Sequence, residues 1–364
     1  MPSQNHSTSS TLMVAFMMLV TLPMHACNHL AFPTWLGEEE RNLLQTPSPT
    51  PNIMVAKDGT TKYTTIQSAF DDVPNLRAKE DDRFIIYVKG GTYGEILDMN
   101  LANIMLVGEG IGLTIITGNR SVGGGYSTWN STTFAVSAER FIARGITFQN
   151  TAGPQNGMAV ALRSGANFSV FYLCGFEGYQ DTLNVHIGYQ FFRDCEIHGT
   201  VDFIFGFATA VIQNSTIYVR KPMEGQPNVI TAHGRSTLED KSGISIQNSR
   251  VLASPDLKPV QHLFPTYLGR PWRPYARTVF METFLDTLIN PAGWLAFNGS
   301  LGLDTLYYGE YKNTGPGASI TGRVKWIGYH AITDPTEASQ FTVAKFIQGD
   351  AWLPNTSVPY NPGL

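Results

Sequence analysis

Val170-Phe-Tyr-Leu-Cys174 and Gln190-Phe-Phe-Arg-Asp-Cys195 are two short β-rich runs whose cysteines lie 21 residues apart. Three other runs have the same character and close on asparagine: Gly145-Ile-Thr-Phe-Gln-Asn150, Ala210-Val-Ile-Gln-Asn214 and Gly243-Ile-Ser-Ile-Gln-Asn248. Along the chain, successive closing residues are 24, 21, 19 and 34 positions apart. Strands that return about every 20 residues are typical of a solenoid, in which stacked coils bury a shared core. We therefore predict an all-β, right-handed parallel β-helix; the pattern alone leaves an antiparallel sandwich open.

A second pair of residues has the same spacing as the cysteines. Asp181 and Asp202 are also 21 residues apart. Equal offsets mean equal positions on successive coils, and neighbouring strands lie about 4.8 Å apart. The two cysteines should then stack at a separation that suits a disulfide, and the two carboxylates should lie on one face of the solenoid.

Two close carboxylates point to catalysis. They repel each other when both are ionised, so their pKa values separate. One can then remain protonated as a general acid while the other is an anionic nucleophile. The alternative is that each aspartate only caps a turn, which is the usual role of a lone aspartate.

The neighbours of the aspartates favour the catalytic interpretation. Gln180 precedes Asp181, and a side-chain amide can donate to a developing oxyanion. Asp202 lies in the apolar run Gly199-Thr-Val-Asp-Phe-Ile-Phe-Gly206 and needs a charged partner, for which Arg270 is the candidate. Trp272 is either a core residue or an exposed aromatic that stacks on a sugar. His186 and His198 alternate with apolar residues, so we interpret both as structural.

The composition suits a globular protein with a sizeable core: 364 residues, 43% hydrophobic and 15% charged. The 35 glycines and 21 prolines favour many short strands and turns. A net charge of -4 gives no basic footprint for nucleic acid, so we expect no such partner. An acidic polymer remains open as a substrate, because a mildly acidic protein can still carry a local basic site.

The first residues have the pattern of an export signal. The run from Thr11 to Leu22 is apolar, too short to span a bilayer and long enough for a signal peptide, and Ala26 offers a cleavage point. We predict a signal peptide at 1–26, a polar, proline-rich leader at 27–51 and a β-helix domain at 52–364. A membrane anchor is the alternative for the apolar run; no later stretch is long enough to span, so we expect none.

Export would permit disulfides and glycosylation, and we expect a secreted protein of the extracellular space or cell wall. Cys174 and Cys195 are predicted to pair, and Cys27 to be unpaired or removed. Six sequons for N-glycosylation follow the signal, at Asn119, Asn130, Asn167, Asn214, Asn298 and Asn355.

A few short helices should lie outside the solenoid. One is predicted by apolar residues at helical intervals, with Pro74 expected to end it. Those residues are Ile66, Ala69, Phe70 and Val73. Another should begin with the cap Asp334-Pro335-x-Glu337, continue through Phe341, Ala344 and Lys345, and stop at Gly349. The apolar run from Phe84 to Val88 predicts a strand that ends in a turn.

Several motifs, in this order, resemble those of the plant-type pectinesterases, also called pectin methylesterases, and the resemblance covers nearly all of 52–364. They are Gly91-Thr-Tyr-Gly-Glu95, Ile146-Thr-Phe-Gln-Asn-Thr-Ala-Gly153, Ala159-Val-Ala-Leu-Arg163, Tyr179-Gln-Asp-Thr-Leu183, Gly199-Thr-Val-Asp-Phe-Ile-Phe-Gly206 and Leu268-Gly-Arg-Pro-Trp272. The family fold is a right-handed parallel β-helix.

The resemblance implies a role for each candidate residue. Asp202 matches the nucleophile that forms an acyl-enzyme, and Asp181 the acid that releases methanol and then activates water. Gln180 matches a stabiliser of the oxyanion, and Arg270 the residue that holds the nucleophile. Trp272 and Thr128 match substrate-binding positions. Met158 lies at a further expected substrate-binding position, where the sequence departs from the family pattern.

The resemblance also implies the reaction and its partners. The expected substrate is pectin (homogalacturonan), whose methyl-esterified galacturonosyl units lose methanol during cell-wall modification. Neither a metal nor an organic cofactor is expected. A proteinaceous pectinesterase inhibitor is a candidate partner, and we expect a monomer. Many plant members carry an inhibitor-like region before the catalytic domain, and the 51 residues here are too few for one, so the short type is expected.

Three residues depart from the family pattern. Met158 stands where members usually have Gln, a second oxyanion donor that also touches substrate. Loss of one such donor costs on the order of 100- to 1000-fold in rate. Asn184 replaces a common aromatic, and Phe207 a common Asn. One alternative is therefore a weakened or inactive pectin-binding glycoprotein. The other is a depolymerase on the same fold, which is disfavoured because the sequence has no carboxylate cluster of the kind that a calcium-dependent lyase needs.

Overall fold

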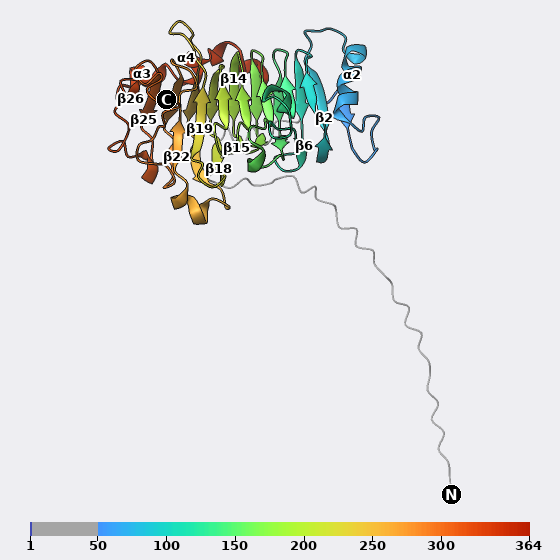
Figure 1. The fold of residues 1–364 in the computed structure, drawn as a ribbon. Helices are drawn as coiled ribbons and strands as arrows, with labels where there is room; N and C mark the ends of the chain where they lie inside the picture. The colour runs from blue at the N-terminus through green and yellow to red at the C-terminus, as the bar shows by residue number, and fades with distance from the viewer. Residues whose placement is uncertain (2–49) are drawn as a thin grey trace. The chain divides into compact units, whose positions relative to one another are not determined.

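The computed structural model describes Met1 and residues 50–364, and the compact unit from Pro49 to Leu364 contains the fold. Nearly all of the predicted signal peptide and leader lies outside the described residues. The chain coils into a right-handed parallel β-helix of three sheets with eleven, eight and seven strands, as predicted (Figure 1). Every strand pairing recorded between the strands of this unit is parallel.

The strands of each sheet follow one another at every coil. The eleven-stranded sheet contains β1 (Ile53–Val55), β2 (Phe84–Val88), β5 (Ile104–Val107), β8 (Ile142–Arg144), β11 (Ser169–Tyr172), β14 (Tyr189–Arg193), β17 (Thr209–Gln213), β20 (Gly243–Gln247), β23 (Arg277–Met281), β25 (Tyr307–Tyr311) and β26 (Tyr329–Ala331). The eight-stranded sheet contains β3 (Gly91–Gly94), β6 (Thr114–Gly118), β9 (Thr147–Asn150), β12 (Gly175–Glu177), β15 (Glu196–Gly199), β18 (Thr216–Val219), β21 (Arg250–Ala253) and β24 (Phe284–Leu285). The seven-stranded sheet contains β4 (Leu97–Met99), β7 (Phe134–Val136), β10 (Leu162–Ser164), β13 (Leu183–Val185), β16 (Ile204–Gly206), β19 (Asn228–His233) and β22 (Thr266–Gly269).

Stacked aromatic rings fill the interior of the coils. Phe171 and Phe192 are paired in register on β11 and β14, and their rings stack 4.8 Å apart at an angle of 9°. Phe148 and Phe176 repeat this arrangement on β9 and β12, 5.8 Å apart at 13°. All four rings are fully buried. Burial of each ring stabilises the folded state by about 1.5–3 kcal/mol. The runs that recur in the sequence therefore correspond to recurring core positions.

The corner between the eleven- and eight-stranded sheets explains the closing residues of the runs. Asp194, Asn214 and Asn248 adopt a left-handed backbone there, with φ of 53°, 54° and 50°. Asn and Asp tolerate this conformation better than most residues. Cys174 and Cys195 lie one position further on. The closing residues of the five runs therefore do not occupy equivalent positions, so their predicted alignment was wrong. The run that closes on Asn150 belongs to β9 of the eight-stranded sheet.

After this corner, side-chain oxygens link successive coils. The Cys195 amide donates to Ser215 Oγ (3.0 Å), the Ser215 amide to Ser249 Oγ (3.2 Å), and the Ser249 amide to Thr283 Oγ1 (3.3 Å). Asn313 Oδ1 accepts from the amide of Thr283 (3.0 Å) and continues the series. A buried amide at the corner therefore finds a partner on the next coil, which joins the coils where regular strand pairing stops.

The expected disulfide is not formed. Cys174 and Cys195 are stacked on successive coils as predicted, yet both are free and buried. Their thiols point to main-chain oxygens, with Cys174 Sγ 3.4 Å from the carbonyl of Tyr172 and Cys195 Sγ 3.4 Å from that of Phe171. The coil spacing brings the two residues together, but each thiol already has an acceptor.

The helices differ in detail from the prediction. Helix α2 spans Ile66–Leu76 and contains Pro74, which does not end it: the ring removes one N–H donor, and the helix continues until the Arg77 amide donates to the carbonyl of Val73. Near the C-terminus, α3 (Pro335–Ser339) begins at the predicted cap, where Asp334 accepts from the amide of Thr336. A separate helix, α4 (Val343–Phe346), follows, so the predicted single helix is in fact two.

The remaining helical elements are short 3-10 turns, and the chain ends on the outside of the coils. The turns are η1 (Trp129–Ser131), η2 (Pro154–Asn156), η3 (Lys258–Leu263), η4 (Pro316–Ala318), η5 (Gly349–Ala351) and η6 (Leu353–Thr356). Beyond them, Asn361 exchanges two hydrogen bonds with the side chain of Gln213, and Gly363 accepts one from Gln247. Among the described residues, no helix is both long and apolar enough to cross a membrane.

The two cysteines provide a test of this packing. Burial raises the pKa of Cys174 to about 12 and that of Cys195 well above its usual value, so both should stay protonated and shielded. We predict that iodoacetamide at pH 8 alkylates neither residue in the folded protein and both in guanidinium. Peptide mass mapping without reductant reads the result. Alkylation of the folded protein, or recovery of the two peptides joined, would contradict the structure.

Candidate active site

A cleft of about 410 Å³ lies on the outer face of the seven-stranded sheet. It contains every catalytic and substrate-binding residue predicted from the sequence. Its lining comprises Thr128, Trp129, Met158, Gln180, Asp181, Asn184, His186, Asp202, Phe205, Phe207, Ala232, Arg270, Trp272 and Phe297. The strands of that sheet run side by side through β10, β13, β16 and β19, and they place residues of successive coils next to each other.

Asp181 and Asp202 occupy equivalent positions just before β13 and β16. The pairing of Leu183 with Ile204 puts the two aspartates in register, and the amide of Asp181 donates to the carbonyl of Val201 (3.1 Å). Both have a left-handed backbone, with φ of 63° and 50°. The same local turn therefore brings each carboxylate out of the coil onto the floor of the cleft, as the equal offsets predicted.

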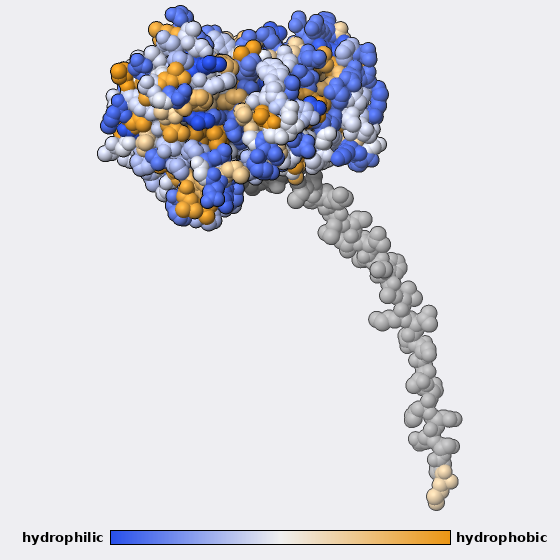
Figure 2. Space-filling model, viewed as in Figure 1, coloured by the Kyte–Doolittle hydropathy of each residue, from blue (hydrophilic) through white to orange (hydrophobic). Residues whose placement is uncertain are grey.

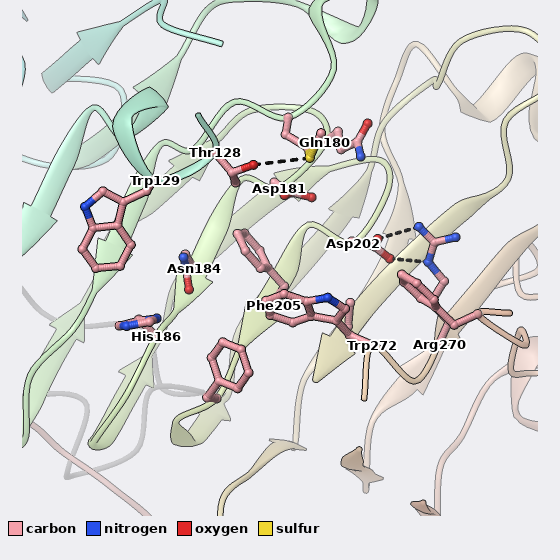
Figure 3. Close-up of a pocket in the computed structure, with 14 residues that line it drawn as sticks. Thr128, Trp129, Gln180, Asp181, Asn184, His186, Asp202, Phe205, Arg270 and Trp272 are labelled. Carbon is pink, nitrogen blue, oxygen red and sulfur yellow. Dashed lines mark hydrogen bonds and ion pairs between the residues drawn. The ribbon is translucent and has the colours of Figure 1, made fainter. Parts of the chain in front are cut away.

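Arg270 follows β22 and holds Asp202 with two hydrogen bonds. Its Nε lies 2.8 Å from Oδ1 and its Nη2 lies 2.6 Å from Oδ2. Figure 3 shows Asp202 between Arg270 and Asp181 in this view, with both oxygens turned to the guanidinium. The ring of Phe297 covers the guanidinium at 4.6 Å. Such a two-point contact orients the carboxylate and favours its charged form.

The environment separates the two aspartates chemically. Burial raises the pKa of Asp181 well above its usual value, and the Asp202 charge raises it further. Burial also raises the pKa of Asp202, but the hydrogen bonds and charge of Arg270 oppose that effect. Within residues 50–364, no cationic side chain forms an ion pair with Asp181. The pair can therefore supply one protonated acid and one anion, which is the arrangement expected from the sequence.

The wall above Asp181 carries Gln180, Met158 and Thr128. The hydroxyl of Thr128 donates to the sulfur of Met158 over 3.4 Å (Figure 3). A thioether is only a weak acceptor and cannot donate. Gln180 is thus the side-chain amide of this wall that can donate to an oxygen beside Asp181.

Aromatic side chains form the opposite side of the cleft. The rings of Phe207 and Trp272 lie 4.7 Å apart, and Phe205 meets Trp272 edge-on at 6.2 Å. Trp272 is half-buried and lines the cleft, so it is not a simple core residue. Figure 2 shows apolar surface over β19 and β22 beside strongly hydrophilic residues. A surface of this kind suits a ligand with both apolar and polar faces.

Several cleft residues were not predicted from the sequence. His186, which the sequence suggested to be structural, lines the cleft and meets Trp129 edge-on at 5.0 Å. His198 lies elsewhere, stacked on Tyr218 at 4.7 Å on the eight-stranded sheet. The 21-residue offset could have indicated these positions. Asn184 is in register with Phe205, and the rings of His186 and Phe207, which are also 21 residues apart, meet edge-on at 6.0 Å.

The predicted sequons lie at the surface. The asparagines are exposed in five of them, and Asn167 is half-buried and bonded to Glu139 and Tyr189. Within residues 50–364, no group of three or more His, Cys, Asp and Glu residues is placed to hold a metal ion.

Comparisons with known proteins point in one direction. A family model described as Pectinesterase matches residues 52–350. Pectinesterase 2 of Citrus sinensis is 56% identical over 333 residues, which cover 92% of this chain and 64% of that protein. The solved pectin methylesterase from carrot has a TM-score of 0.84 at 48% identity and covers 88% of this chain and 100% of its own. A pectin methylesterase solved in complex with a hexasaccharide has a TM-score of 0.68 at 27% identity, covering 87% and 100%.

The buried acid makes a prediction about stability. Since the pKa of Asp181 is raised in the folded state, the folded protein holds its proton over a pH range in which the unfolded chain has lost it. The protonated group contributes fully below the ordinary pKa, and this contribution is lost as pH rises through the raised value. Asp181→Asn cannot ionise, so its Tm should rise relative to the wild type as pH increases, by about 2 °C or more at pH 8.

Thermal unfolding monitored by circular dichroism from pH 4 to pH 8 measures this difference. Asp194→Asn is the matched control, because Asp194 has a similar backbone conformation at another corner of the coil. A difference between Asp181→Asn and the wild type that stays flat, or that shrinks as pH rises, would show that Asp181 is not held neutral.

Proposed function

Because this chain belongs to the pectinesterase family, we propose that it hydrolyses methyl esters of galacturonosyl units in pectin, with Asp202 as nucleophile and Asp181 as general acid and base. The observation that carries this proposal is the geometry of the pair: Asp202 is oriented by two bonds from Arg270, while the raised pKa of Asp181 keeps it protonated. The chain spans 64% of the length of its citrus relative, and the activity is proposed for the β-helix domain.

In the first half of the reaction, a carboxylate oxygen of Asp202 attacks the ester carbonyl carbon. The carbonyl oxygen becomes an oxyanion, for which the Gln180 amide is the side-chain donor. When the carbon–oxygen bond to the methoxy group breaks, Asp181 gives its proton to the leaving oxygen and methanol departs. The products of this half are a mixed anhydride on Asp202 and an ionised Asp181.

In the second half, the ionised Asp181 acts as a base. It takes a proton from water, and the resulting hydroxide attacks the galacturonosyl carbonyl carbon of the anhydride. Cleavage of the bond to Asp202 restores its carboxylate and releases the acid, while Asp181 is protonated again. One ester and one water thus give one methanol and one galacturonic acid, and the enzyme returns to its starting state.

The aromatic side of the cleft suits a polysaccharide. Sugar rings have apolar faces that stack on aromatic rings, and Trp272 with Phe207 offers such a surface. A neighbour of this fold has been solved with a hexasaccharide, which supports a cleft that takes several sugar units. Hydrolysis of the ester is favoured over chain cleavage because the citrus relative is named a pectinesterase and the carrot protein a pectin methylesterase.

We also propose where the enzyme acts and with which partner. We infer a secreted, glycosylated, monomeric enzyme of the cell wall, for which a proteinaceous inhibitor is a candidate partner. A second candidate function is a weakened, pectin-binding protein. The observation in its favour is Met158, whose sulfur accepts from Thr128 where an amide donor would otherwise face the oxyanion.

The first test of this function removes the two carboxylates. Asp202→Asn should fold normally and lose methanol release from methylated pectin by on the order of 1000-fold or more, because an amide is a poor nucleophile. Asp181→Asn should lose activity through failed protonation of the leaving group. Methanol is measured at steady state, with Asp194→Asn as the control. Turnover near the wild-type rate in Asp202→Asn would remove it from the mechanism.

The second test concerns Met158. Met158→Gln adds a donor of similar length beside Gln180 and should raise kcat by about 100- to 1000-fold. KM should change less, because the added hydrogen bond strengthens mainly as charge develops on the oxygen. Met223→Gln is the control, since Met223 is exposed outside the cleft. An unchanged kcat would mean that Met158 is not a defect, and inactivity of both forms would favour the pectin-binding protein.

A further inference from the structure

Arg220 joins three successive coils at the turn that leads to Gln180. It follows β18, and its backbone amide donates to the carbonyl of Gly199 on the preceding coil (2.8 Å). Its side chain reaches one coil further back, to Gly178 and Tyr179, which precede it by 42 and 41 residues. Arg220 is not among the residues that line the cleft, yet its contacts end one residue before Gln180.

The guanidinium of Arg220 makes three contacts with that turn. Its Nη1 donates to the carbonyl oxygen of Gly178 (3.1 Å), and its Nη2 donates to the hydroxyl of Tyr179 (2.6 Å). Its Cζ lies over the Tyr179 ring, 3.8 Å from the ring centre. Within residues 50–364, both hydrogen bonds of the Arg220 side chain go to this turn, and none of the ion pairs there includes it. Removal of the guanidinium therefore affects this turn before any other part of the fold.

The main chain around Gln180 is held, whereas its side chain is not. The carbonyl of Tyr179 accepts from the amide of Thr200 (3.0 Å) and from the hydroxyl of Thr182 (3.1 Å). The carbonyl of Gln180 accepts from the amide of Ala159 (3.1 Å). The Gln180 side chain is half-buried, and its amide has no hydrogen-bond partner among the described residues. Its direction is therefore set by the backbone that carries it, and a shift of Tyr179 would move it.

We propose that Arg220 is a positioning residue for the esterase reaction: it holds Tyr179 so that the amide of Gln180 stays aimed at the oxygen that becomes negative. The inference rests on the proposed function, in which Gln180, on the wall of the cleft, is the side-chain donor to the oxyanion (Figure 3). Such a donor is effective only when it is in place before the charge forms, and a displacement of about 1 Å can cost about 100-fold in rate. Arg220 acts through the turn, from outside the cleft.

The contact depends on the shape of the side chain as well as on its charge. A guanidinium is planar and donates in fixed directions, so it can stack on a ring while it bonds a hydroxyl and a carbonyl. The ammonium group of lysine is a point donor without a plane to stack. Tyr179 supplies both the ring and the hydroxyl, and phenylalanine at that position would keep the ring alone.

Steady-state methanol release from methylated pectin tests the proposal. Arg220→Met should lower kcat by about 10- to 100-fold with KM nearly unchanged, because the misplaced donor is needed mainly in the transition state. Arg220→Lys should lose nearly as much, and Tyr179→Phe should lose about 2- to 10-fold. Arg250→Met is the matched control and should keep the wild-type kcat. Arg250 also lies over an aromatic ring, that of Phe284 at 5.6 Å, and it lies on β21, three strands from β12 in the same sheet.

A double-mutant cycle shows whether Arg220 acts through Gln180. Once Gln180→Ala has removed the donor, Arg220→Met should cost little more in kcat, because the two losses share one cause. Equal losses of kcat in the two backgrounds would overturn the proposal. A loss confined to Tm or to KM would do the same, since it would show that Arg220 only supports the fold. If Arg220→Met does not fold, Tyr179→Phe takes its place in the cycle, and an unchanged kcat in that variant would then be the contrary result.

Crystal structures of the wild type and Arg220→Met separate this proposal from the proposed function. The turn at Tyr179 and Gln180 should shift by about 1 Å in the variant, while Asp202 and Arg270 stay in place. If the wild type releases no methanol, the esterase function is wrong, and the structures alone decide whether Arg220 positions Gln180. A displaced turn would support that role, and a turn that has not moved would overturn it.

Discussion

The pairing of each coil with the coils on either side is the constraint on which the rest of this molecule depends. Because the strands are parallel and in register, two residues separated by one coil length become spatial neighbours. The side chains then repeat along the stack, as rings inside the coil, as hydroxyls at one corner and as carboxylates at another. The rings of the core, the hydroxyls of the corner and the carboxylates of the cleft are therefore three sets of side chains that repeat with the same coil spacing.

The stacked coils bring together, in the cleft, groups that lie too far apart in the sequence to belong to one short motif. Asp181 and Asp202 come from adjacent coils, while Arg270 follows β22, two strands beyond β16 in the same sheet. The rigid stack fixes their spacing, and the left-handed turns lift both carboxylates from the sheet. The different chemistry of the two acids comes from Arg270, since it contacts only Asp202 directly.

Much of this arrangement could be predicted from equal spacings. The offset of 21 residues placed the aspartates and the cysteines on successive coils, and the apolar setting of Asp202 called for a partner such as Arg270. The disulfide could not be settled in this way, because coil spacing brings residues together without fixing where their thiols point. His186 was missed because alternation with apolar residues also describes an outward position on a strand. Pro74 misled because a proline lacks its own N–H donor yet keeps a helical φ, so the helix continues for two more residues.

The contacts of residues 361–363 affect the order in which parts of the fold can form. Asn361 and Gly363 bond to Gln213 and Gln247, which precede them by 148 and 116 residues. Coils can stack one after another as the polypeptide leaves the ribosome, because each needs only its predecessor. The outer surface of β17 and β20, however, is covered in part by residues 361–363. During synthesis, the middle of the stack therefore stays without this cover until those residues have been made.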